Sequence, residues 1–128
     1  MSNTITTVLE GILIVDDSPV ITHAMSGLLN SHGFKVVGIA VNGLEALKKV
    51  YESHPAIVLM DLNMPLLDGY NTIKAVKKIN PLIKVIAFSA ESDKANVVKA
   101  MKAGADDYLL KPVKAENLFR VIDKIVSG

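Results

Sequence analysis

Most residues of this sequence that could take part in chemistry stand directly after short β-rich runs. They comprise three carboxylates, an amide, a hydroxyl and an ammonium group: Asp16, Asp17, Asp61, Asn63, Ser89 and Lys111. In open α/β sheets, ligands bind beyond the carboxyl ends of the parallel strands, next to the point where the strand order reverses. If the runs form such a sheet, these side chains meet at one edge and can act on the same ligand.

A cluster of three aspartates needs a cation, because carboxylates a few ångströms apart repel one another and raise each other's pKa. No His or Cys is close by in the sequence, so the ligands are all oxygen, which suits Mg²⁺. Lys111 adds a positive charge for an anion, and Ser89 adds a hydroxyl donor. An aspartate such as Asp61 can accept a phosphoryl group as an acyl phosphate. The residues therefore predict phosphoryl transfer supported by Mg²⁺, with Asp61 as the nucleophile.

Five β-rich runs alternate with five helical patterns along the chain. The runs are 12–15, 35–41, 56–60, 83–88 and 107–110, and apolar residues recur at helical spacing in 20–29, 44–50, 73–79, 97–101 and 118–125. This alternation predicts an α/β fold with a parallel sheet. A closed barrel needs eight such units, so we expect an open, doubly wound, five-stranded sheet, for which 2-1-3-4-5 is a common strand order. Asp68 and Gly69 predict a turn, in which glycine adopts a backbone conformation that other residues resist.

Composition narrows the class of protein. The chain has 128 residues, a length typical of one domain, and its 14 basic and 13 acidic residues give a net charge of +1. This charge is too small for non-specific nucleic-acid binding or polybasic membrane docking. Cysteine is absent, which excludes disulfides, thiolate metal sites and cysteine nucleophiles. We expect a single cytoplasmic domain over residues 1–128, with a loose leader at 1–10, no signal peptide and no membrane insertion.

Four segments in this order resemble the response-regulator receiver domains of bacterial two-component signalling. They are Ile14–Asp17, Met60–Gly69, Phe88–Ala90 and Gly104–Pro112. The resemblance covers essentially the whole chain and, with no output domain, is strongest to the stand-alone chemotaxis-type regulators. It implies the flavodoxin-like (βα)5 fold with strand order 2-1-3-4-5.

The resemblance also implies a role for each residue of the acidic cluster. Asp61 is the implied phosphoacceptor, which receives its phosphoryl group from a sensor histidine kinase or a phosphotransfer protein. Asp17, the Asp61 side chain and the main-chain carbonyl of Asn63 would ligate Mg²⁺, with Asp16 acting mainly through water. Lys111 would pair with the phosphate.

Further residues are implied to respond to the phosphate. Ser89 would bond a phosphoryl oxygen, and Tyr108 occupies the aromatic switch position, which turns inward when Ser89 moves. Asn63 and Glu91 occupy positions that tune self-dephosphorylation. The peptide bond before Pro112 is implied to be cis.

The resulting hypothesis is a phosphorylation-activated switch, not a turnover enzyme. Phosphate at Asp61 would change the surface formed by the fourth helix, the fifth strand and the fifth helix, and so control an unspecified partner protein. The sequence leaves open a monomer or a phosphorylation-dependent dimer, and predicts no direct contact with nucleic acid.

Three alternatives remain. The chain could be the receiver half of a longer DNA-binding regulator that dimerises through the last two helices, with Asp107 and Arg120 at the interface. It could be a Mg²⁺-dependent aspartyl-phosphate phosphatase of the haloacid dehalogenase class, but these enzymes need a second aspartate as general acid where this chain has Asn63. A nucleotide or flavin module is the third, although neither a Walker lysine motif nor a Gly-x-Gly-x-x-Gly motif follows the first strand.

Overall fold

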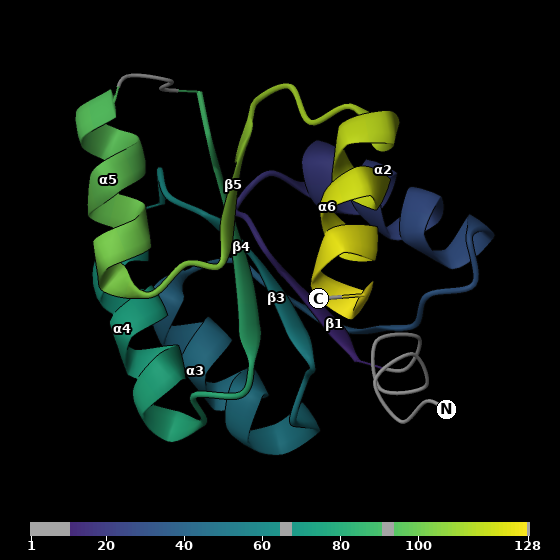
Figure 1. Ribbon diagram of the computed structural model, residues 1–128. Coiled ribbons are helices and arrows are strands. Elements are labelled where there is room, and N and C mark those ends of the chain that lie inside the picture. Colours follow the sequence, from purple (N-terminus) through teal and green to yellow (C-terminus); the bar gives the residue numbers. More distant parts are fainter. Residues whose placement is uncertain (1–10, 65–67, 91–93, 128) are drawn as a thin grey trace.

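The computed structural model describes residues 11–64, 68–90 and 94–127. It contains a five-stranded sheet in the order β2-β1-β3-β4-β5, and every strand pair is parallel. The open, doubly wound α/β fold and the strand order predicted from the sequence are confirmed (Figure 1). The predicted leader at 1–10 lies outside the described residues.

All five predicted strands and all five predicted helices are present. The strands are β1 (Ile12–Val15), β2 (Val36–Ala40), β3 (Ile57–Asp61), β4 (Lys84–Ser89) and β5 (Asp107–Leu110). The helices are α2 (Pro19–Ser31), α3 (Gly43–Ser53), α4 (Gly69–Ile79), α5 (Lys94–Ala103) and α6 (Ala115–Ser127). Asp61 and Ser89 are the last residues of β3 and β4, whereas the sequence predicted that each would directly follow its strand. In the described part of the chain, no helix combines the length and apolarity that a membrane span requires.

The helices cover both faces of the sheet (Figure 1): α3, α4 and α5 on one face, α2 and α6 on the other. Successive side chains of a strand point to opposite faces. In β1, Leu13 and Val15 accordingly pack under the three-helix layer, while Ile12 and Ile14 pack under the two-helix layer. Because both faces are buried, the central strands are continuous apolar runs with no polar alternation.

Side-chain caps start two of the helices soon after the strands that precede them. Asn42 Oδ1 accepts a hydrogen bond from the Glu45 N–H at 2.8 Å, and Glu45 Oε1 accepts one from the Val41 N–H at 3.1 Å. This reciprocal pair is a capping box at the start of α3. Asp68 is the N-cap of α4, and its Oδ1 accepts a hydrogen bond from the Asn71 N–H at 2.8 Å. The caps fix where α3 and α4 leave the carboxyl edge of the sheet.

The turn predicted at Asp68 and Gly69 is wrong. Glycine is required at position 69 because a larger side chain would collide with the neighbouring backbone. Gly69 is the first residue of α4, and among the described glycines only Gly33 and Gly104 have a positive φ. A Cβ atom on Gly69 would lie 2.7 Å from Leu62 Cα and 3.0 Å from the Asp61 carbonyl oxygen. Glycine therefore lets the start of α4 approach the end of β3 at van der Waals distance.

Candidate acidic site at the carboxyl edge of the sheet

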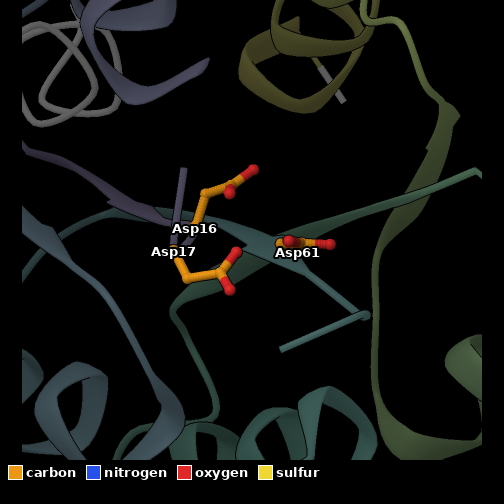
Figure 2. A group of neighbouring side chains, drawn as sticks. All are labelled: Asp16, Asp17 and Asp61. Carbon is orange, nitrogen blue, oxygen red and sulfur yellow. The ribbon is translucent and has the colours of Figure 1, made fainter. Parts of the chain in front are cut away.

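Asp16, Asp17 and Asp61 meet at the carboxyl edge of the sheet (Figure 2). One carboxylate oxygen from each lies within 4.8 Å of the others. They converge because β1 and β3 are paired neighbours, so the two residues after β1 lie beside the last residue of β3. Asp16 and Asp61 are buried, while Asp17 is exposed at the mouth of the cluster. In Figure 2 the Asp17 carboxylate is directed toward Asp61.

Lys111 provides the positive charge of the site. Its Nζ lies 3.0 Å from Asp61 Oδ1 and 3.9 Å from Asp16 Oδ2. The lysine follows β5, which is separated from β3 by β4, so its side chain extends across the end of β4. On this path Nζ lies 5.5 Å from the centre of the Phe88 ring. One ammonium group thus faces three carboxylates, and the cluster keeps an excess of negative charge.

Asp16 carries a carboxylate oxygen that the described residues do not satisfy. Its Oδ1 accepts a hydrogen bond from the Ser18 N–H at 2.8 Å, whereas the buried Oδ2 has no hydrogen-bond partner. Burial raises the pKa of Asp16, the Asp61 and Asp17 carboxylates raise it further, and the Ser18 N–H and Lys111 oppose the shift. An unsatisfied oxygen beside two further carboxylates is the kind of hard donor set that Mg²⁺ prefers, so the residues fit this ion.

Asn63 joins the acidic cluster to Ser89. Its backbone N–H donates to Asp61 Oδ1 at 3.0 Å. Its side-chain Oδ1 accepts a hydrogen bond from Ser89 Oγ at 2.9 Å. The end of β3 and the end of β4 are therefore connected through one amide side chain next to the Asp61 carboxylate.

The remaining predicted site residues lie around this centre. Ser89 is buried at the end of β4, and Tyr108 is half-buried on the edge strand β5, packed against the core of the three-helix face. The Lys111–Pro112 peptide bond is cis, as the resemblance implied. Glu91 lies outside the described residues.

Two residues support the site in ways that the sequence did not indicate. Ser18 is the N-cap of α2, and its backbone N–H also holds Asp16 by donating to Oδ1 at 2.8 Å. An aspartate two residues before a serine is the pattern of an Asx-turn, so a signal existed. Gly69 contacts the backbone of Asp61 and Leu62, and no local pattern indicates so close an approach.

Comparisons with known proteins identify relatives of this chain. The chain is 38% identical to the chemotaxis protein CheY of Thermotoga maritima over 114 residues, which cover 89% of this chain and 95% of the relative. It is 36% identical to the chemotaxis protein CheY of Bacillus subtilis over 116 residues, covering 91% and 97%.

A solved structure shows that this fold occurs in a related protein. The structure of the CheX–CheY–BeF3–Mg²⁺ complex from Borrelia burgdorferi matches with a TM-score of 0.89 at 26% identity, covering 96% of this chain and 93% of that chain. Residues 12–123 match the family described as the response regulator receiver domain. This match spans most of the sequence, and the chain therefore belongs to the response regulator receiver domain family.

Proposed function

We propose that Asp61 is the phosphoacceptor of this receiver domain and that its phosphorylation switches a protein-binding surface. One observation carries the proposal: a buried aspartate ends the central strand with two carboxylates on one side and the Lys111 ammonium 3.0 Å away. Asp17, Asp61 and the main-chain carbonyl of Asn63 would hold Mg²⁺, with Asp16 acting mainly through water. When bound, Mg²⁺ supplies positive charge that stabilises the transferring phosphoryl group.

The chain's own groups suit an in-line transfer. A carboxylate oxygen of Asp61 attacks phosphorus, so a P–O bond forms while the P–N bond to the histidine of a kinase or phosphotransfer protein breaks. The departing imidazole keeps the electron pair of the broken bond and takes up a proton. Lys111, which neutralises Asp61 before transfer, neutralises the phosphoryl oxygens afterwards. The Asn63 N–H keeps the Asp61 carboxylate oriented through its bond to Oδ1.

The hydrogen bond between Ser89 and Asn63 supports a switching role. Ser89 Oγ donates to Asn63 Oδ1 in the unmodified protein, and a phosphoryl oxygen on Asp61 offers it a charged acceptor instead. Movement of Ser89 would then be followed by Tyr108, which changes the surface of α5, β5 and α6. That surface already exposes apolar groups, with Met101 at 43% and Leu110 at 49% exposure. Such groups suit a protein partner.

The other candidate functions have less support. A phosphatase needs a general acid two residues after Asp61, and Asn63 cannot supply a proton in this role. For a dimerising DNA-binding regulator, Asp107 was one of two proposed interface residues, and its Oδ2 already lies 2.8 Å from Lys124 Nζ of the same chain. A single-domain chain and a cytoplasmic location stay predictions.

The deciding experiment is intact mass spectrometry after incubation with Mg²⁺ and acetyl phosphate. We expect one added phosphoryl group in the wild type, none in Asp61→Asn, and none when Mg²⁺ is chelated. Asp123→Asn serves as the matched control, because Asp123 is an exposed aspartate on α6, and it should behave as the wild type. An adduct that persists in Asp61→Asn identifies a different nucleophile and refutes the proposal.

A missing adduct in the wild type is resolved by a second measurement. Beryllofluoride with Mg²⁺ mimics an acyl phosphate, and amide NMR spectra should then shift around Asp61, Ser89 and Tyr108 if the phosphate is only short-lived. Unchanged spectra at these residues would refute the assignment of Asp61.

A further inference from the structure

A basic groove runs between α4 and α5 on the three-helix face of the sheet. Its volume is about 720 Å³, and its lining combines four lysines with apolar side chains, among them Lys74, Lys94, Lys99, Lys102, Tyr70 and Val98. The lining residues of α5 fall at 94, 98 and 102 and at 95 and 99, which is one face of a helix. Met101 follows Val98 by three residues and Lys94 by seven, so the groove adjoins the proposed switch surface along α5.

Within the described residues, no carboxylate compensates the positive charge of the groove. Among the described residues, no carboxylate lies within 4.0 Å of any of its four lysines and none lines the groove, whereas Lys77, Lys84, Lys111 and Lys124 each have an acidic partner. The four groove lysines belong to a chain whose total net charge is only +1. Lysines gathered without partners repel one another, so helix stability does not explain their arrangement.

The position of Lys94 strengthens this point. Lys94 is the first residue of α5, and the first turn of this helix holds no acidic residue. The N-terminus of a helix carries partial positive charge, and a lysine there is electrostatically unfavourable. Lys94 therefore adds to the basic lining of the groove at the start of α5, directly after Glu91 and Asp93 in the sequence.

Two contacts preform the groove. Tyr70 Oη on α4 donates a hydrogen bond to Asn96 Oδ1 on α5 at 3.0 Å. Lys99 Nζ lies 4.3 Å from the centre of the Tyr70 ring, which is a cation–π distance. These contacts link the two helices, so a partner meets a shaped surface and little ordering is required on binding.

We propose that this groove is a docking site for an acidic, amphipathic segment of a partner protein. Carboxylates of the segment would pair with the lysines, while one or two of its apolar side chains would pack on Val98 and Tyr70. A concave groove with an apolar lining favours a protein segment over a lipid headgroup layer, which needs a broad basic surface. The contacts that form the groove are those of the unmodified protein, so the proposal goes beyond the function proposed above.

The test uses the full chain, without Mg²⁺ or phosphodonor, and a synthetic peptide. The probe is an acidic helix of about 15 residues, long enough to form three to four turns, with glutamates at i, i+4 spacing on either side of two leucines. We expect amide shifts confined to α4 and α5 and an affinity that falls with added salt. The double variant Lys94→Glu/Lys102→Glu should weaken binding by more than about tenfold.

Matched variants separate the groove from general charge effects. Lys35→Glu/Lys48→Glu makes the same change in net charge at exposed sites outside the groove and should bind within about twofold of wild type. Val98→Gln should weaken binding, whereas Leu82→Gln, at a side chain that is 81% exposed elsewhere, should not. Asp61→Asn should bind as the wild type, which keeps this test independent of the phosphoacceptor.

Several outcomes would overturn the proposal. Equal loss in the Lys35 and Lys48 variant means that charge alone drives binding. If a peptide with both leucines replaced by serine binds with equal affinity, apolar contacts do not contribute to binding and the amphipathic part of the proposal is wrong. Binding to phosphatidylglycerol vesicles but not to the peptide would assign the groove to anionic lipid instead.

Discussion

The carboxyl edge of the sheet and the groove between α4 and α5 use charge in opposite ways. At the edge, Asp16 and Asp61 are about 1% exposed, and an N–H group and Lys111 fix the Asp61 carboxylate at 3.0 Å. In the groove, four exposed lysines lie without carboxylate partners among the described residues. At the edge, buried carboxylates hold negative charge in a fixed geometry. In the groove, lysines hold positive charge on long, solvated side chains.

This difference matches the ligands proposed for the two sites. A small cation requires donors at set distances, and the acceptor of a phosphoryl group must lie in line with the donor, so burial and backbone hydrogen bonds are suitable. A protein segment can adapt to its partner, and flexible lysines give attraction and orientation without a fixed geometry. Substitutions should therefore have large effects at the edge and small effects in the groove, except on binding of an acidic partner.

The largest effect is expected for Asp17→Asn. Asp17 is the exposed carboxylate of the cluster, and its replacement removes a proposed metal ligand while the fold keeps its core. We expect Mg²⁺ affinity to fall by at least about 100-fold, beyond the typical loss for residues that only support a ligand. Isothermal titration with Mg²⁺ measures this, with Asp123→Asn as control. A loss below about threefold would mean that Asp17 is not a ligand.

Gly69→Ala tests whether the edge tolerates added volume. The new Cβ would lie 2.7 Å from Leu62 Cα, a backbone atom that cannot move without shifting the end of β3. We expect the free energy of unfolding to fall by about 1–3 kcal/mol and phosphorylation of Asp61 to slow. Urea denaturation measures the first effect. Gly27→Ala, where a Cβ meets nothing within 4 Å, should be neutral or stabilising.

Asp16→Asn should stabilise the protein when no Mg²⁺ is present. Burial raises the pKa of Asp16 above its ordinary value of 3.8, so the folded protein binds this proton more tightly than the unfolded chain does. The free energy of unfolding consequently falls as pH rises from 3.8 through the raised pKa. Asparagine removes this loss while its Oδ1 still accepts the Ser18 N–H. The variant should be more stable than the wild type at pH 7, and the two proteins should be equally stable below pH 3.8. Thermal unfolding at pH 3.5 and pH 7 with EDTA checks the difference, and a gain that is equal at both pH values would contradict it.

Substitutions of the groove lysines should have the smallest effect on the acidic edge. Lys94→Glu/Lys102→Glu changes four units of charge but no buried contact, so stability should change by less than about 0.5 kcal/mol. The rate of phosphorylation by acetyl phosphate should stay within about twofold, because salt screens exposed charges at these separations. Urea denaturation and mass spectrometry measure the two quantities. A large loss of phosphorylation would show that the two regions are coupled.

Much of the acidic edge could be predicted from the sequence because strand topology places it. Once five strand–helix units are recognised, the residues after each strand must meet at one edge, whatever the details of packing. Asp16, Asp17, Asp61, Ser89 and Lys111 follow from this rule. The Ser89–Asn63 hydrogen bond did not, because it depends on side-chain rotamers.

Close packing explains what the sequence could not indicate. Gly69 was interpreted through backbone conformation, the usual local reason for glycine, whereas the actual reason is the distance to a strand that ends eight positions earlier. The groove was missed for a similar cause. The lysines of 94–102 do not indicate a groove in the sequence, because only the packing of α4 beside α5 brings Lys74 and Tyr70 next to them.

The place of Asp61 on β3 has a consequence for dynamics. This strand is hydrogen-bonded to β1 on one side and β4 on the other, and it is buried throughout. Its amide protons should exchange with deuterium only when the whole domain opens, which makes it the slowest-exchanging segment. A phosphoryl group on Asp61 would thus be attached to the least mobile part of the chain, while Asn63, Ser89 and Lys111 contact it from the ends of their segments. The phosphorylated atom would keep its position, and the signal would consist of how the neighbouring residues rearrange around it.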